Sequence, residues 1–176
     1  IGSSIAGLTA ARVLANHFDH VTVVERDRLP DQIDFRKGVP QARHAHVLLL
    51  RGQMILEELF PGLRQELLDA GAISINVGME LDFRMMGEWL PHFPSDMEAT
   101  ACSRPLLENA IYRRLAADPR ITFRPHTDVL QICAGDDNRQ VRSIYLSNRA
   151  QGDVEELAAD LILDASGRNS QAPEWL

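Results

Sequence analysis

Residues 1–25 constrain the possible fold more than any other part of this 176-residue chain. Gly2 and Gly7 enclose a short turn, and residues 5–17 continue as a predicted helix rich in alanine. Residues 20–25 (HVTVVE) form a largely β-branched run of the length typical of a buried parallel strand. A glycine turn, a helix and a strand in this order predict a βαβ unit, and therefore an α/β fold with a parallel sheet.

The segment GSSIAG at positions 2–7 matches the glycine fingerprint of dinucleotide-binding folds, with Ser4 where the second glycine usually stands. Gly2 allows the tight turn into the helix, and Gly7 allows the helix to lie close against the sheet. The backbone amides from Ser4 to Ala6 begin the helix, where the positive end of its dipole favours a pyrophosphate. Ser4 narrows the approach to the backbone, but its hydroxyl can itself donate a hydrogen bond. The segment therefore predicts a phosphate-binding turn.

Glu25 ends the predicted strand, about 20 residues after the glycine turn, and extends this interpretation toward a nucleotide. A carboxylate at this place accepts hydrogen bonds from the two hydroxyls of an adenosine ribose and repels a 2′-phosphate. Arg26, the next residue, is a further candidate contact. The alternative is an ordinary glycine turn followed by a surface glutamate. Turn, helix, strand and acid arrive in the order of a dinucleotide site, which favours the nucleotide.

Four segments carry a resemblance to a known family. GSSIAGLTAARVL (2–14) and VTVVERD (21–27) resemble the beginning of FAD-dependent monooxygenases of the para-hydroxybenzoate hydroxylase type. RKGVPQARHAH (36–46) and LFPGL (59–63) resemble one bacterial branch of that superfamily. The resemblance extends over essentially the whole chain. It implies a Rossmann-like FAD-binding domain with a parallel sheet, a β-meander crossover and part of a substrate-side antiparallel sheet.

The resemblance also implies contacts with the cofactor. Arg104, in the segment SRPLLENAIYRRL, matches an arginine that opens a helix and reaches the phosphate or ribityl region. A guanidinium suits that place because it can fork onto phosphate oxygens, although a surface arginine near a helix start is the alternative. Val129 matches a position whose backbone meets the adenine, and a plain core valine is its alternative.

Two further segments resemble flavin contacts. LDASGR, which contains Gly167, resembles the second flavin segment of the family, but Ser166 stands where the family often has the aspartate of an Asp-Gly pair. This departure weakens the inference of a nicotinamide contact more than that of a flavin contact. Arg43 and His44 belong to a loop that in the family lies toward the isoalloxazine ring, and a solvated pair is the open alternative. No catalytic residue and no metal site is predicted.

The rest of the chain alternates between predicted helices and strands. An antiparallel meander is expected in the second half, with its first turn at 136–138, and a buried strand is expected at 160–165. The other expected elements are helices at 45–59, 63–70 and 105–117, short strands within 73–93, a strand at 121–124, and the meander strands 127–134, 140–148 and 154–158. Residues 1–72 and 101–176 are expected to form the FAD-binding domain, with 73–100 beginning a substrate-side region whose C-terminal half is absent here.

Composition excludes several classes of function. The net charge of −7 argues against a broad surface for nucleic acid or anionic membranes. No apolar run approaches the roughly 20 residues of a membrane helix, so no stable membrane insertion is expected. Two distant cysteines predict neither a disulfide framework nor a metal site, and a cytoplasmic location is the default expectation.

The function expected from these features is that of an FAD-dependent oxidoreductase. The resemblance implies a monooxygenase that uses NAD(P)H and O₂ to hydroxylate or epoxidise a small organic substrate, with this piece alone inactive. A flavin-dependent reductase of the isoprenoid-reductase type and a non-catalytic nucleotide-binding module are the alternatives. A simple NAD-dependent dehydrogenase is least favoured, because about 75 residues of mixed structure separate Glu25 from Arg104 where short βα units would repeat.

Overall fold

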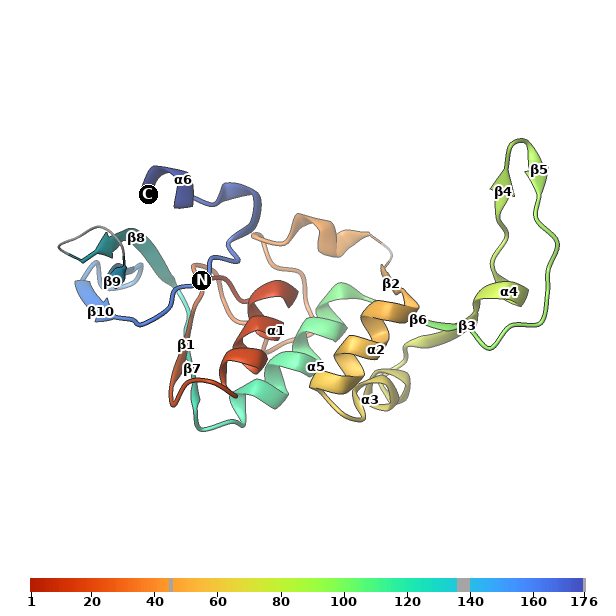
Figure 1. The fold of residues 1–176 in the computed structure, drawn as a ribbon, viewed down its shortest axis with the longest axis horizontal. Helices are drawn as coiled ribbons and strands as arrows, with labels where there is room; N and C mark the ends of the chain where they lie inside the picture. The colour runs from red at the N-terminus through yellow and green to blue at the C-terminus, as the bar shows by residue number, and fades with distance from the viewer. Residues whose placement is uncertain (45, 136–139, 176) are drawn as a thin grey trace.

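The computed structural model describes residues 1–44, 46–135 and 140–175, and it shows an α/β protein with parallel and antiparallel sheets (Figure 1). The helices are α1 (Ile5–Leu14), α2 (Leu50–Leu59), α3 (Leu63–Asp69), α4 (Val77–Glu80), α5 (Arg104–Ala116) and α6 (Ala172–Trp175), with 3₁₀ turns at Pro40–Arg43 and Gly167–Asn169. The strands are β1 (Val21–Val24), β2 (His46–Leu48), β3 (Ile73–Asn76), β4 (Arg84–Met85), β5 (Glu88–Trp89), β6 (Glu98–Cys102), β7 (Ile121–Arg124), β8 (Thr127–Ala134), β9 (Val141–Asn148) and β10 (Val154–Ala158).

Strands β1 and β7 form a parallel pair, in register from Val21 opposite Ile121. Helices α1 and α5 lie side by side and pack on this pair, as the sequence predicts for a βαβ unit (Figure 1). Leu8 and Ile111 are completely buried where the two helices meet the strands. Helices α2 and α3 extend the same core with Leu56, Leu63 and Leu67.

The antiparallel meander is confirmed. Strands β8, β9 and β10 pair in sequence order and lie beside β1, on whose Val24 their Ile144 and Leu146 pack (Figure 1). The predicted turn at 136–138 lies outside the described residues.

The predicted strand at 160–165 is wrong as a sheet strand. The segment is irregular, and it makes two backbone hydrogen bonds with Ile1: Leu163 O accepts from Ile1 N at 2.7 Å, and Ala165 N donates to Ile1 O at 2.8 Å. A ladder needs successive residues on both partners, and within the described chain only Ile1 lies alongside. The apolar run therefore extends without becoming a strand of a sheet.

The predicted helix at 45–59 is partly wrong, because its beginning is the strand β2. The strand β6, which the sequence analysis above does not predict, pairs antiparallel with β2 on one side and with β3 on the other. His46 lies opposite Cys102, so partners more than 50 residues apart decide the conformation of this short segment. Local helix propensity is a weak preference that such tertiary pairing overrides.

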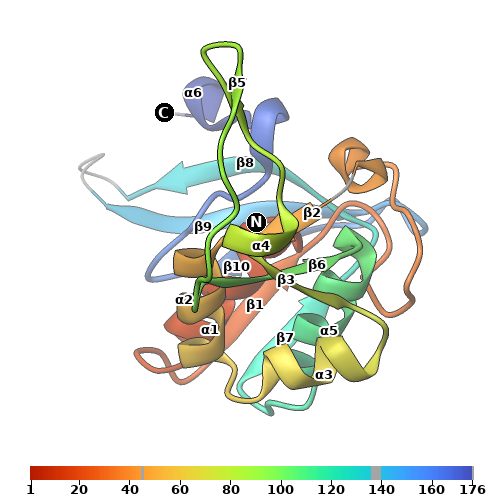
Figure 2. The same cartoon turned by 90° about the vertical axis from the view of Figure 1, so that its right-hand side faces the viewer.

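An arm formed by residues 77–97 extends from β3 and β6, away from the body of the molecule (Figures 1 and 2). It contains the one-turn helix α4 and the hairpin of β4 and β5. Met86 and Gly87 form the two-residue turn of this hairpin, and both have positive φ, 53° and 91°. Short strands are thus confirmed here, although α4 interrupts them.

Candidate functional site

The turn before α1 requires glycine at both of its ends. Gly2 has φ +96°, and a Cβ at this position would lie 2.6 Å from the carbonyl oxygen of Ala165. A Cβ on Gly7 would lie only 1.8 Å from the carbonyl oxygen of Gly2. Both contacts are with backbone, which cannot move aside as a flexible side chain can. The two glycines therefore fix the path of the chain from Ile1 into α1.

No side chain of the described residues caps the start of α1. Ser4 is its N-cap residue with extended backbone, and Ser4 O accepts from Leu8 N to begin the helix. The Ser4 hydroxyl does not bond back to the first turn but donates to Glu108 Oε1 at 2.6 Å. The first amides of a helix have no intrahelical acceptor, so those around Ile5 and Ala6 are available to an anion.

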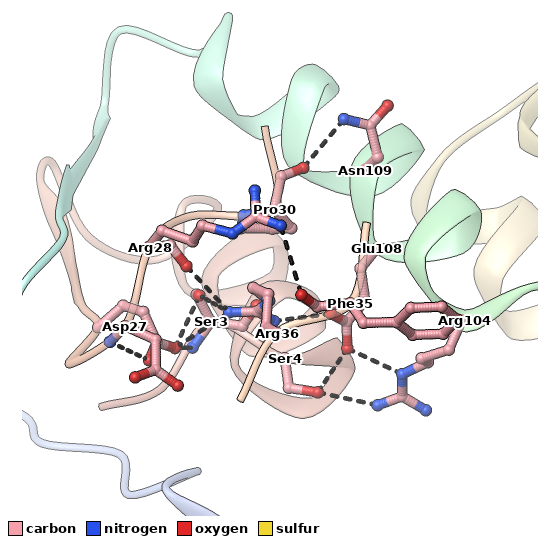
Figure 3. A network of polar contacts seen from close by, with 11 residues as sticks. Ser3, Ser4, Asp27, Arg28, Pro30, Phe35, Arg36, Arg104, Glu108 and Asn109 are labelled. Atoms are coloured by element: carbon pink, nitrogen blue, oxygen red, sulfur yellow. Dashed lines mark hydrogen bonds and ion pairs between the residues drawn. The ribbon is translucent and has the colours of Figure 1, made fainter. Parts of the chain in front are cut away.

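Arg36 is the centre of a buried polar network beneath this turn (Figure 3). Its side chain is only 3% exposed. One terminal nitrogen donates to Ser3 O at 3.2 Å and to Glu108 Oε2 at 2.6 Å, and the other donates to Ser3 Oγ at 3.1 Å. The guanidinium thereby joins the loop before the Pro40 turn to both the glycine turn and α5.

Glu108 supplies the negative charge that pairs with Arg36 in this network. Its other oxygen accepts from Arg104 Nε at 2.8 Å, and Arg104 Nη2 donates to Ser4 Oγ at 2.9 Å (Figure 3). Burial alone would raise the pKa of Glu108, but the hydrogen bonds from Ser4, Arg104 and Arg36 outweigh it and lower the pKa below its ordinary value. Glu108 is therefore ionised at neutral pH between two arginines.

Glu25 lies on the other side of Ser3 and is 8% exposed. Its Oε2 accepts from the backbone N and the hydroxyl of Ser3, both at 2.8 Å, and its Oε1 accepts from Asp27 N at 2.9 Å. Arg36 lies 3.5 Å from the same carboxylate. Each carboxylate oxygen can accept more than one hydrogen bond, so Glu25 both holds the turn and retains capacity toward a ligand.

A cavity of about 410 Å³ opens beside these residues, within the size range of small-molecule sites. Five of the predicted contact residues line it: Gly2, Ser4, Glu25, Arg26 and Val129. The fold brings them together from the glycine turn, the end of β1 and the strand β8.

The other predicted contact residues do not line this cavity. Ala6 and Gly7 lie in α1, behind the turn. Arg104 does not line the cavity itself but binds the Ser4 hydroxyl at its edge. Arg43 is exposed, with its guanidinium 5.6 Å from the centre of the Phe35 ring. Gly167, with φ +81°, is exposed at the start of the second 3₁₀ turn.

Ala165 and Ser166, rather than Gly167, line the cavity from this segment. The hydroxyl of Ser166 is buried and has no hydrogen-bond partner within the described part of the chain. Asp164 orders this turn by accepting from Ser166 N at 2.8 Å and from the hydroxyl of Ser170. A buried hydroxyl without a partner is costly, so its position beside the glycine turn marks a place where a bound polar group would be stabilising.

Ser3, Arg36, Glu108 and Ser166 were not predicted as site residues. Glu108 stands four residues after Arg104, the helical spacing that brings opposite charges together, and this signal was available. Arg36 gave no such signal, because a buried arginine and a surface arginine have the same local sequence.

No family model matches the chain. Protein Rv3254 of Mycobacterium tuberculosis is 36% identical over 196 aligned residues, which include all of this chain and 39% of that protein. The chain thus spans well under half the length of this curated relative.

Solved structures share the fold at low sequence identity. The flavin-dependent monooxygenase PieE, in complex with FAD and substrate, matches 99% of this chain and 30% of its own, with a TM-score of 0.72 and 18% identity. A flavoprotein/dehydrogenase from Cytophaga hutchinsonii matches 99% of this chain and 40% of its own, with a TM-score of 0.68 and 21% identity. PqsL of Pseudomonas aeruginosa, a probable FAD-dependent monooxygenase, matches 87% and 38%, with a TM-score of 0.63 and 19% identity. These likenesses show that the chain has the fold of FAD-binding flavoproteins.

Proposed function

We propose that this chain forms the FAD-binding part of an FAD-dependent oxidoreductase. The observation that carries the proposal is the start of α1, which follows the obligatory glycine turn and adjoins a cavity lined by Glu25 and Ser166. Among the described residues, no side chain caps this helix start and none bonds to the Ser166 hydroxyl. An ADP-containing cofactor offers a matching group for each of these: an anion for the helix start, a ribose diol for the Glu25 carboxylate and a polar group for the Ser166 hydroxyl.

The residues fit FAD in distinct roles. The amides at Ile5 and Ala6 would hold the pyrophosphate, with Arg104 at the edge of the same turn. Glu25 would accept from the ribose hydroxyls, and Val129, half-buried on β8, would meet the adenine. This chain therefore binds and orients the cofactor.

The bound flavin would supply electron transfer from NAD(P)H and, in a monooxygenase, the transfer of one oxygen atom from O₂ to a small organic substrate. Two of the three structures compared above, PieE and PqsL, are flavin-dependent monooxygenases or probable ones, which supports this activity. The third is a flavoprotein/dehydrogenase, which supports a flavin-dependent reductase as the second candidate.

The first test is the visible absorption spectrum of the full-length protein that contains this chain. We expect a yellow protein that retains one FAD after desalting. Replacing Glu25 by Gln should weaken FAD binding about tenfold, because a neutral amide accepts the ribose hydrogen bonds less well. Glu58→Gln, an exposed change on α2, is the matched control and should leave FAD binding unchanged.

A colourless protein that takes up no FAD would contradict the proposed function. For a protein that binds FAD, oxygen consumption with NADH or NADPH separates the two activities. Substrate-stimulated oxygen uptake supports the monooxygenase, and reversible reduction of substrate without oxygen uptake supports the reductase.

A further inference from the structure

We propose that Ser4 is a positioning residue that fixes Arg104 against the phosphate-binding turn. On this view, the serine at the second glycine position of the fingerprint strengthens cofactor binding instead of impairing it. The inference rests on the proposed function, since it concerns how the same turn binds the phosphates of FAD.

Three hydrogen bonds form a closed ring at this place (Figure 3). The Ser4 hydroxyl donates to Glu108 Oε1 at 2.6 Å and accepts from Arg104 Nη2 at 2.9 Å, while Arg104 Nε donates to the same Glu108 oxygen at 2.8 Å. A hydroxyl has one proton, and this one is directed to Glu108. Ser4 therefore does not offer its own proton to a phosphate, in contrast to the role expected from the sequence, but it does hold a guanidinium that can.

The ring compensates the positive charge of Arg104 and restricts its side chain. A cation in the first turn of α5 is disfavoured by the helix dipole, and a long flexible side chain loses conformational entropy when a ligand orders it. Glu108, one turn later, compensates the charge, and Ser4 fixes the second nitrogen. Arg104 Nη1 makes no hydrogen bond within the described part of the chain, so its two N–H groups stay available to a ligand.

Charge around the turn also supports the inference. Glu108 alone would repel a pyrophosphate, but Arg36 binds its second oxygen at 2.6 Å. Two guanidinium groups thus flank the Glu108 carboxylate, and Arg36 also lies 3.5 Å from Glu25. The two arginines balance the two carboxylates, so the buried acids do not leave an unbalanced negative charge beneath the turn. Glycine at position 4 would remove the hydroxyl and leave Arg104 attached through Nε alone.

The test measures the Kd for FAD of the full-length apoprotein by titration, for the wild type, Ser4→Gly and Ser4→Ala. We expect both variants to bind about tenfold more weakly, although Ser4→Gly restores the usual fingerprint. Thr9→Ala, on the same helix, is the matched control, because the Thr9 hydroxyl bonds only to carbonyls of α1 and its loss should leave the Kd unchanged. An unchanged or tighter Kd for Ser4→Gly would overturn the inference.

A double-mutant cycle with Arg104→Met separates positioning from a general structural effect. If Ser4 acts through Arg104, Ser4→Ala should change the Kd by less than about twofold once Arg104 is Met. An equal loss in both backgrounds would show that Ser4 acts on the turn itself, and it would also overturn the inference. A wild type that binds no FAD removes the proposed function together with the inference, whereas a wild type that binds FAD alongside an unaffected Ser4→Gly removes the inference alone.

Discussion

Two regions of the molecule, the junction of α1 and α5 and the arm at residues 77–97, differ in which side chains they bury. At the junction, charged groups are buried: Glu108 is 2% exposed and Arg36 is 7% exposed, and each binds the other. On the arm, large apolar groups face solvent, with Met86 fully exposed and Trp89 65% exposed.

This difference shows where the chain's stability resides. The buried charges are satisfied by partners from the glycine turn, the loop at Arg36 and α5, so losing one charged group removes hydrogen bonds from its partners in a medium of low dielectric constant. The exposed apolar groups of the arm bury much less of their surface within the described residues. Contiguous exposed apolar side chains commonly mark a contact surface, and their substitution should leave the stability of the body unchanged.

The largest effect is expected at Glu108. Glu108→Leu leaves Arg36 and Arg104 without their common acceptor, and we expect a loss of about 3–5 kcal/mol of unfolding free energy, measured by urea denaturation. The control is Glu155→Leu, which removes an ion pair with Arg124 whose two side chains are 49% and 32% exposed. That change should cost less than about 1 kcal/mol. Equal losses in the two variants would remove the distinction between buried and exposed polar groups.

A smaller effect is expected from one added methyl group at the glycine turn. Gly7→Ala should destabilise the protein by about 1–3 kcal/mol and abolish FAD binding, because its Cβ would meet the backbone of Gly2. Gly52→Ala makes the same change in α2, where a Cβ would have no atom within 4 Å, and should stabilise by about 0.5–1 kcal/mol. Effects of the same sign in thermal melts would argue against close packing at Gly7.

The contribution of Glu108 should depend on pH in a defined direction. Its pKa is lower in the folded protein than the ordinary value of 4.5, so its stabilising effect is fully present above pH 4.5 and is lost as pH falls through the folded pKa. The stability difference between the wild type and Glu108→Leu should therefore be constant from pH 7 to 5 and narrow below 4.5. A difference that widens on acidification would contradict the network of hydrogen bonds to the ionised form.

The smallest effect is expected on the arm. Met86 has φ 53° ahead of Gly87, the conformation of a two-residue hairpin turn in which asparagine precedes glycine with least strain. Met86→Asn should stabilise the hairpin by about 0.5–1 kcal/mol, seen as slower hydrogen exchange of Leu90 N, which donates to Phe83 O. The melting temperature of the body should not change. A shift of the global melt would show that arm and body unfold as one unit.

Much of the fold was predictable because its signals are local. The glycine turn, the small residues of α1, the β-branched strand β1 and the meander β8–β10 each follow from neighbours within a few residues. Ser103 is the N-cap of α5, and its hydroxyl accepts from Leu106 N, a capping pattern of the local kind. Of the site, the residues closest to the fingerprint, Gly2, Ser4 and Glu25, were predicted and line the cavity.

What the sequence by itself determined is the order of elements and the position of the turn, because sterics and local periodicity act over a few residues. What only the tertiary structure decided depends on distant partners. The strand β6 forms because β2 and β3 lie on either side of it, and the run at 160–165 forms no ladder because it meets only Ile1. Likewise, Arg36 becomes a buried bridge because Glu108, 72 residues later, comes within 2.6 Å. Burial and pairing arise only when the chain is folded, so no local pattern contains them.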